Sequence, residues 1–387
     1  MPAGRRRRIW TIPVGATLLA SSALCGCGAP DQPDIPDRAA LSGARSLADV
    51  GGMDALVAAA KAEGRLNAIA MPEDWANYGG IIAAFEKKYG IDVTVENPDG
   101  SSRDVLRALG EERPEGEAVD VLEVGMSQAQ EAEQQNLFAR YTVERDGAVL
   151  ETRKDPGSAW YANYGGYVSL GCALVHVKEC PRTFADLLKP EYKGKVALNG
   201  DPTQSNSALA GVIAAALAND GSFNDVAPGV EFFRELTERG NYISAQTSVE
   251  AIKDGSVPIV IDWDFKTAEY WEELVNDETQ WVVQVPVDGV FSAFYATAVN
   301  SQAAHPAAAR LWQEYLFSDE AQNLRLQGYA RPVLMEHMEK EETLDVISAG
   351  WLPKIPPYEP GDPTGDQLAK AKKVVAEGWE RATRRAG

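Results

Sequence analysis

The chain has 387 residues, of which 45% are hydrophobic and 24% are charged, and its formal net charge is −20. This acidity argues against nucleic acid and anionic membrane surfaces as binding partners, because both repel a strongly negative protein. It favours a cationic ligand, or it keeps an exported protein soluble. The three histidines are scattered without metal-site spacing, and no pattern predicts a cofactor.

The first thirty residues predict export. Arg5–Arg8 form a basic head, Ile9–Leu24 form an apolar run, and a small-residue region with Cys25 and Cys27 follows. We interpret residues 1–26 as a signal peptide and Cys27 as the residue that becomes lipidated. Cys25 is a weaker candidate because leucine precedes it, and an ordinary cleaved signal is the alternative. Removing the four arginines of the leader from a charge of −20 leaves about −24.

The residues after the leader predict a tether followed by two domains. Residues 27–47 are rich in Pro, Asp, Ala and Ser without hydrophobic periodicity, which is typical of a flexible linker. The remaining length exceeds one typical core and predicts two lobes. The expected parts are residues 48–160 as lobe 1, 161–288 as lobe 2, 289–335 as a return to lobe 1, and 336–387 as a C-terminal wrap and helix.

Strand-like and helix-like segments alternate in lobe 1, which predicts an α/β fold with parallel strands and right-handed crossovers. The helical period of residues 78–89 ends at Gly90, a residue suited to cap a helix. The expected elements are a strand at 65–70, this helix, a strand at 91–96, a helix that follows Ser101 and Ser102 and runs to about Leu109, and a strand at 120–124.

Residues 163–177 combine glycines with an apolar strand, and we interpret them as the first crossing between the lobes. Pro306 begins a later helix, as proline often does. The other expected elements are strands at 196–198 and 257–261, helices at 208–218 and 230–238, return strands at 281–287 and 291–299, the helix 306–316, and a terminal helix after a proline-rich stretch at 350–366.

Four segments resemble the solute-binding proteins of ABC importers, of the spermidine/putrescine and ferric-iron type. The most specific are Leu-Lys-Pro-Glu-Tyr-Lys-Gly within residues 187–198 and Phe-Ser-Asp-Glu-Ala-Gln within 309–322. The others are Trp-Ala-Asn-Tyr at 75–78 with the following helix, and residues 255–264. The resemblance implies a type II periplasmic-binding-protein fold, with two mixed sheets flanked by helices and a hinge between them. Ligands of such open sheets bind beyond the carboxyl ends of the strands.

The resemblance implies several ligand contacts. Trp75 falls where polyamine binders keep an aromatic wall, and its face could attract an ammonium group; packing at a helix start is the alternative. Asp201 matches an amine-gripping carboxylate, although plain N-capping of the following helix is the alternative. Thr203 and Ser205 precede a helix, where they could instead bind an anion or cap the helix.

A second group of candidates follows two strands. Asp262 and Asp264 lie two residues apart, so in a strand they share one face and Trp263 takes the other, unless a turn begins there. Trp263 matches an aromatic wall of the polyamine binders, whereas Asp264 could cap the next helix. Ser127 follows the third strand and is a candidate polar contact by position.

Other residues limit the choice of ligand. Polyamine binders carry an acid where this chain has Phe294, which favours a shorter amine, an amino-phosphonate or another zwitterion. Ferric iron is the alternative ligand. Iron binders of the family use adjacent tyrosines, whereas Tyr295 stands alone here, which makes iron the less favoured of the two. Cys172 and Cys180 either form a disulfide or pack as small apolar residues.

The sequence therefore predicts a monomeric solute-binding lipoprotein, not an enzyme. It would lie outside the cell on a lipid anchor, capture a small amine-bearing or zwitterionic solute, and deliver it to an ABC permease with its ATPase. No nucleophile elbow, phosphate loop or metal cluster supports a hydrolase, although Asp262 and Asp264 could be interpreted as an acid–base pair.

Overall fold

A computed structural model describes residues 37–111, 113–114, 116–274, 278–357 and 361–384, which lie within one compact unit. The predicted signal peptide and both candidate lipidation sites, Cys25 and Cys27, lie outside the described residues. Among the described residues, no helix combines the length and the apolar character that crossing a bilayer requires.

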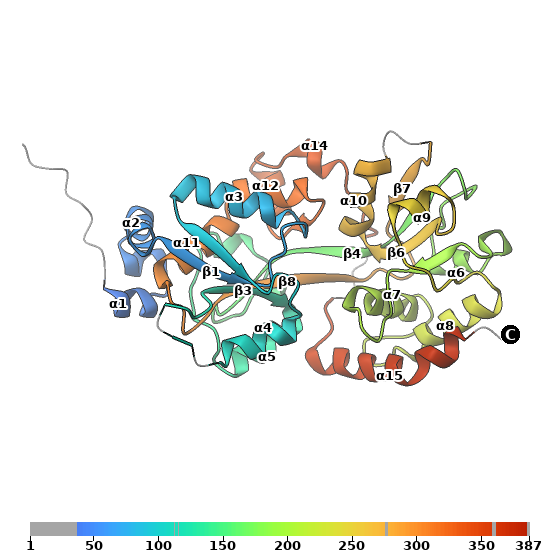
Figure 1. Cartoon of the computed structure of the whole chain (residues 1–387), viewed down its shortest axis with the longest axis horizontal. Helices are drawn as coiled ribbons and strands as arrows, with labels where there is room; N and C mark the ends of the chain where they lie inside the picture. The colour runs from blue at the N-terminus through green and yellow to red at the C-terminus, as the bar shows by residue number, and fades with distance from the viewer. Residues whose placement is uncertain (1–36, 112, 115, 275–277, 358–360, 385–387) are drawn as a thin grey trace, which may run out of the picture. The chain divides into compact units, whose positions relative to one another are not determined.

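Lobe 1 is built on a sheet in which β1 (Arg65–Ile69) pairs in parallel with β2 (Asp92–Glu96) and β3 (Val121–Gly125), as the sequence predicts. Strand β8 (Ser292–Val299) pairs antiparallel with β3, and β9 (Arg331–Pro332) pairs with β4. Figure 1 shows these strands between helices from both ends of the chain. The helices of this lobe are α1 (Arg38–Gly43), α2 (Met53–Glu63), α3 (Tyr78–Tyr89), α4 (Ser102–Leu109), α5 (Met126–Gln134), α11 (Pro306–Leu316), α12 (Asp319–Gln327), α13 (Met335–Lys340) and α14 (Val346–Ala349).

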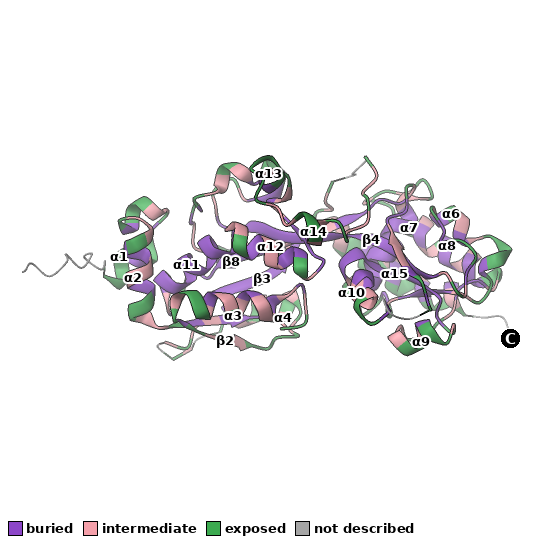
Figure 2. Ribbon diagram, turned by 90° about the horizontal axis from the view of Figure 1, so that it is seen from above, coloured by how far each residue is buried: buried purple, intermediate pink, exposed green. Residues whose placement is uncertain are grey.

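The strand β4 (Tyr161–Ala173) belongs to both lobes. Its first half pairs with β8 and β9, whereas its second half pairs with β6 (Ile259–Trp263) and β7 (Trp281–Gln284). The sheet order is β2-β1-β3-β8-β4-β6-β5, where β5 is Val196–Leu198. All thirteen residues of β4 are buried, and Figure 2 shows its ribbon in the colour of burial between the two groups of helices.

Lobe 2 surrounds β5, β6 and β7 with helices. Its helices are α6 (Phe184–Leu187), α7 (Asn206–Leu217), α8 (Ala227–Glu238), α9 (Val249–Lys253) and α10 (Asp264–Leu274). The disulfide Cys172–Cys180 ties the end of β4 to the following loop. The terminal helix α15 (Gly365–Thr383) packs mainly on α8, where the rings of Trp379 and Phe233 lie 5.0 Å apart, and it also reaches α5 and α7.

One prediction about the tether is wrong. Residues 38–43, within the expected flexible segment 27–47, form helix α1, which Asp37 caps, and Leu41 is buried. The guanidinium of Arg310 in α11 donates to the backbone carbonyls of Ser42 and Ala44 at 2.7 and 3.0 Å. A buried guanidinium needs acceptors, so this segment is held against lobe 1. The rest of the expected tether, residues 27–36, lies outside the described residues.

Candidate functional site

A cavity of about 380 Å³ lies where strands of both lobes end, and we call it the main cavity. Lobe 1 contributes the loops after β1 and β2 and the end of β3, whereas lobe 2 contributes the loop between β5 and α7 and the start of α10. Its principal side chains are Trp75, Asp99, Ser101, Ser102, Glu123, Asn199, Ser205, Ser207, Lys266 and Tyr295. This is the position at which open α/β sheets bind their ligands.

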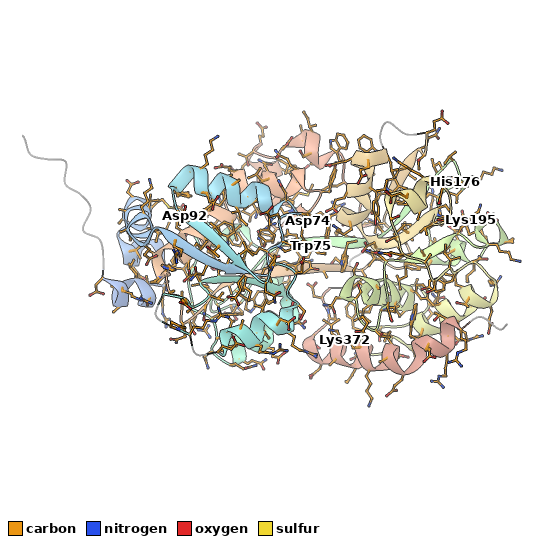
Figure 3. The ribbon with its side chains drawn as sticks, in the orientation of Figure 1. Asp74, Trp75, Asp92, His176, Lys195 and Lys372 are labelled. Atoms are coloured by element: carbon orange, nitrogen blue, oxygen red, sulfur yellow. A yellow bond between two sulfur atoms is a disulfide. The ribbon has the colours of Figure 1, made fainter. Side chains whose placement is uncertain are left out.

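Trp75 lies in the wall of the main cavity, beside the end of β1 (Figure 3). Its indole Nε1–H donates to the hydroxyl of Tyr164 at 2.7 Å, and its ring meets those of Phe265 and Tyr295 edge-on. The ammonium of Lys266 lies 5.2 Å from the centroid of the Trp75 ring. The aromatic face predicted to attract a ligand ammonium therefore already carries a cation of the protein, which also pairs with Glu269.

Asp262 lies behind the wall of the main cavity and is only 1% exposed. Its carboxylate accepts hydrogen bonds from the side chains of Asn199 and Ser207, which line the cavity, and from the amide of Trp263 at 2.7 Å. Burial raises the pKa of Asp262 to about 6, although these three donors oppose the rise. Asp262 thus positions two polar groups of the cavity and does not itself line it.

Asp264 does not share a face with Asp262, because helix α10 begins at Asp264. Its carboxylate accepts from the guanidinium of Arg331 at 2.9 Å and from the amides of Tyr167 and Phe265 at 2.9 and 3.0 Å. The predicted pair of carboxylates pointing together is therefore wrong. Asp264 is fully buried and joins α10 to β4 and β9 where the lobes meet.

The loop between β5 and α7 separates the three candidates that it carries. Asp201 is exposed and its Oδ1 accepts from the amide of Thr203 at 2.8 Å, which is a turn-capping role. Both residues line a hollow beside Tyr242 and Trp379, so Asp201 does not reach the main cavity as the amine-gripping prediction requires. Ser205 does line the main cavity, and its hydroxyl caps α7 by accepting from the amide of Ala208 at 3.2 Å.

Glu123 is a buried acid at the main cavity that the sequence analysis did not select. Tyr164 donates to its carboxylate at 2.6 Å, Tyr78 donates to the other oxygen, and Arg325 lies 3.9 Å away. Burial raises the pKa of Glu123 to about 7, and the Arg325 charge is the largest opposing influence. An acid inside the apolar run of residues 120–124 is the signal that could have identified it, because acids are rarely buried without a partner.

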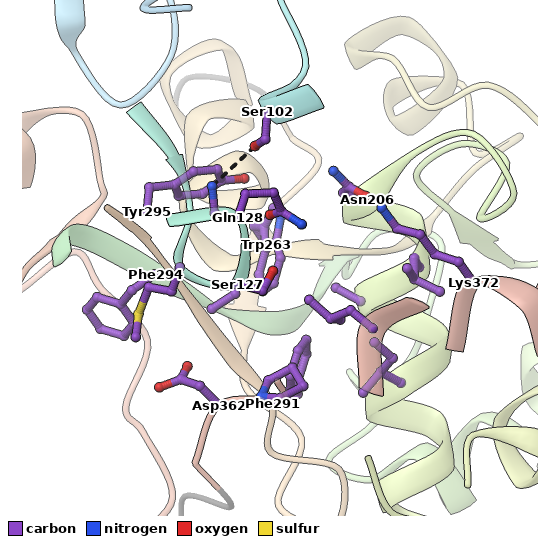
Figure 4. A pocket seen from close by; sticks show the side chains of 18 residues that line it. Ser102, Ser127, Gln128, Asn206, Trp263, Phe291, Phe294, Tyr295, Asp362 and Lys372 are labelled. Carbon is purple, nitrogen blue, oxygen red and sulfur yellow. Dashed lines mark hydrogen bonds between the residues drawn. The ribbon is translucent and has the colours of Figure 1, made fainter. Parts of the chain in front are cut away.

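A second cavity of about 100 Å³ lies between α5, α7 and α15, and we call it the α15 compartment (Figure 4). It contains two candidates that the main cavity lacks, Ser127 and Trp263, which are 6% and 4% exposed. Lys372 of α15 also lines it. Ser102, Asn206 and Tyr295 line both cavities, so the two adjoin. The amide of Gly125 donates to the hydroxyl of Ser102 at 3.2 Å, drawn as the dashed line.

Two tyrosines lie beside the main cavity. Tyr164 and Tyr295 stack with their ring centroids 5.3 Å apart, and burial raises the pKa of each well above its usual range.

Within the described part of the chain, no three His, Cys, Asp or Glu side chains gather in a way that could hold a metal ion.

Comparison with known proteins identifies a family and a fold. Residues 120–349 match the family described as Bacterial extracellular solute-binding protein. Apo ferric ion-binding protein A of Pasteurella haemolytica superposes with a TM-score of 0.63 at 20% identity, covering 84% of this chain and 100% of its own. No curated protein matches the sequence.

Two further solved structures share the fold at lower identity. The spermidine/putrescine ABC transporter substrate-binding protein PotD of Streptococcus pneumoniae has a TM-score of 0.58 at 16% identity, covering 83% of this chain and 99% of its own. The periplasmic binding protein AfuA of Actinobacillus pleuropneumoniae, with fructose-6-phosphate bound, has a TM-score of 0.61 at 17% identity, covering 82% and 99%.

Proposed function

The chain belongs to the bacterial extracellular solute-binding proteins of ABC importers, and from this premise we propose that it captures a small zwitterionic solute of the amino-phosphonate kind. The solute would bind in the main cavity, contact both lobes, and shift the population of the receptor toward a closed form. The closed form would then deliver the solute to a membrane permease. No bond is made or broken in this role.

The observation that carries the proposal is that the main cavity offers groups for both charges. Lys266 and the first turns of α4 and α7, with their serine hydroxyls, suit a phosphonate, because helix N-termini present amide donors and positive potential. The carboxylate of Asp99 lines the same cavity and suits an ammonium group, whereas that of Glu123 already accepts from Tyr78 and Tyr164. A solute that carries both charges can satisfy both sets of groups.

A polyamine fits this arrangement less well. One of its ammonium groups would have to approach Trp75, over whose ring the ammonium of Lys266 lies at 5.2 Å. Like charges at that range repel, and the family's usual acid near β8 is replaced by Phe294.

Ferric iron is the second candidate, favoured by the stacked rings of Tyr164 and Tyr295 beside the main cavity. Iron needs phenolates, but the pKa of each tyrosine is raised, and the hydroxyl of Tyr164 donates a hydrogen bond to Glu123 at 2.6 Å. Tyr164 is therefore engaged as a donor. Addition of ferric citrate should give no visible charge-transfer band, and the appearance of one would favour iron instead.

We also propose that the mature chain stands on the outer side of the cell membrane, anchored through a lipid on Cys27. The support is the basic and apolar leader, which precedes a small residue and a cysteine. Radiolabelled palmitate should enter the wild-type protein in cells and should fail to enter a Cys27→Ala variant. Label retained in that variant would move the anchor to Cys25.

Isothermal titration calorimetry tests the solute class. The mature chain should bind 2-aminoethylphosphonate more tightly than putrescine, and Lys266→Gln should weaken phosphonate binding about tenfold, as loss of one charge-assisted hydrogen bond implies. Lys193→Gln is the matched control, because Lys193 is an exposed lysine of the same lobe outside the main cavity. Tighter binding of putrescine, or equal affinities in both variants, would contradict the proposal.

A further inference from the structure

The α15 compartment has an apolar wall with a few polar groups, which is the usual make-up of a small-molecule site. Leu209 and Ile213 of α7, Phe291 before β8 and Leu368 of α15 supply apolar surface. Its volume of about 100 Å³ is several times the roughly 15 Å³ that admits one water molecule. The compartment can therefore hold a group of several non-hydrogen atoms, such as a carboxylate with its attached carbon.

Trp263 places an unsatisfied donor in this wall. The residue is 4% exposed, and its buried indole Nε1–H has no hydrogen-bond partner among the described residues. A buried donor without a partner costs about 1–3 kcal/mol, and native proteins rarely leave one so. Trp75 shows the contrast, because its Nε1–H donates to Tyr164 at 2.7 Å. Trp263 is therefore the side chain of this wall whose donor lacks a partner in the described part of the chain, and we assign that donor to an acceptor carried by a ligand.

The other polar groups of the compartment also favour an acceptor. Lys372 forms no ion pair with any described residue, and burial together with the nearby charge of Arg103 lowers its pKa. The one carboxylate in the lining belongs to Asp362, which already pairs with Arg153 at 3.4 Å. Ser127, like Trp263, offers a donor from close beside the cavity. The lining thus offers an anionic oxygen the ammonium of Lys372 and the hydroxyl of Ser127 beside the indole of Trp263.

We propose that the α15 compartment is a second subsite of the same solute site and that it takes a carboxylate carried by the solute. This inference rests on the proposed function and narrows it, because the solute then bears a phosphonate, an amine and a carboxylate. The phosphonate lies in the main cavity and the carboxylate accepts from Trp263 and Lys372. Ser102, Asn206 and Tyr295, which line both cavities, mark the passage between them.

The subsite gives the C-terminal helix a direct role in binding. Lys372 and Leu368 both lie on α15, which packs mainly on lobe 2 and also touches α5 of lobe 1 (Figure 3). A solute carboxylate bound there contacts lobe 1 through Ser127, lobe 2 through Trp263 and the terminal helix through Lys372. Occupation of the subsite therefore favours the same closed form as occupation of the main cavity.

Two probes that differ by one carboxylate test the inference. In 2-amino-4-phosphonobutyrate and 3-aminopropylphosphonate the amine and the phosphonate are separated by the same chain, and only the first compound carries a carboxylate. Calorimetry on the mature wild-type chain should give an affinity for 2-amino-4-phosphonobutyrate that is about tenfold higher, the ratio expected for one charge-assisted hydrogen bond.

Two variants locate the effect. Trp263→Phe removes the indole donor but keeps an aromatic ring, and Lys372→Gln removes the ammonium group but keeps a polar side chain. Each should reduce the tenfold preference to about threefold or less and leave the affinity for 3-aminopropylphosphonate unchanged. Lys373→Gln is the control, because the side chain of Lys373, the next residue along α15, is 77% exposed and lies outside the compartment. Circular dichroism of each variant establishes that it is folded.

The outcomes separate the two proposals. Equal wild-type affinities for the two probes, or a preference that persists in both variants, would overturn the second subsite and leave the proposed function standing. Failure of both probes to bind the wild-type chain would refute the amino-phosphonate class itself, and the second subsite with it.

Discussion

Replacing Asp262 by asparagine should change how the stability of the protein depends on pH, because this carboxyl group is buried and titrates differently in the folded and unfolded chain. Asparagine has nearly the same size and cannot ionise. In the folded protein, the Asp262 carboxylate accepts from Asn199, Ser207 and the amide of Trp263, yet burial still raises its pKa from 3.8 to about 6.

The sign of the effect follows from proton binding. The folded chain holds the Asp262 proton more tightly than the unfolded chain does, so this group contributes most stability below pH 4. That contribution is lost as the pH rises through about 6. The rise in pKa corresponds to roughly 3 kcal/mol in the free energy of unfolding. Asp262→Asn lacks this dependence, so its stability relative to wild type should improve by about that amount between pH 4 and pH 7.

Urea denaturation of both proteins at pH 4, 5, 6 and 7 measures the difference. Glu123, whose pKa is also raised by burial, titrates in both proteins and therefore cancels in the comparison. Asp201→Asn is the control, since that carboxylate is exposed. A free-energy difference between wild type and Asp262→Asn that is constant with pH, or that moves in the opposite direction, would refute the reasoning.

Three further changes have definite expected outcomes. Replacing Cys172 and Cys180 together by serine should lower the free energy of unfolding by roughly 2.5 kcal/mol, because the disulfide closes a short loop. Urea denaturation measures this loss, and an unchanged midpoint would contradict it. Gly166→Ala should cost about 1–3 kcal/mol, since a Cβ there would lie 2.6 Å from Oδ1 of Asp264; an unaltered melting temperature would argue against that clash. Asp201→Ala should leave solute affinity within about twofold in calorimetry, because Asp201 lines a hollow separate from the main cavity, and a larger loss would return it to the site.

The local elements of lobe 1 could be predicted from the sequence because short-range chemistry decides them. The apolar period of residues 78–89 and the glycine that follows determine α3, and Gly90 adopts the left-handed conformation that ends it. Ser101 caps α4 as its position indicates, with Asp104 completing the capping box. Parallel pairing of β1 with β2 and β3 follows from the alternation of strands and helices.

The candidate site could be predicted only in outline. Trp75 and Ser205 line the main cavity, and Ser127 and Trp263 line the α15 compartment, because each follows or ends a strand. Asp201 does not line the main cavity, because a loop residue can turn toward either side of the loop and its carboxylate accepts from the amide of Thr203. The residues next to Asp201 in the sequence do not indicate toward which side of the loop its side chain turns.

Asp264 failed for a related reason. Alternation in a strand would put Asp264 on the same face as Asp262 only if the strand continued through residue 264. Helix α10 begins at Asp264, so the alternation ends before it. Its carboxylate binds Arg331, which is 67 residues away in sequence, and no pattern near residue 264 indicates that partner.

The sequence by itself determined the family, the order of strands and helices, and the presence of acids and aromatic residues at strand ends, because these depend on residues close together in the chain. Tertiary structure alone decided which of those side chains line the two cavities. It placed Lys266 over Trp75, buried Asp262 behind Ser207, and put Lys372 and Trp263 in the lining of one cavity. These contacts join segments far apart in the chain, and their geometry is set by how the two lobes and the terminal helix pack.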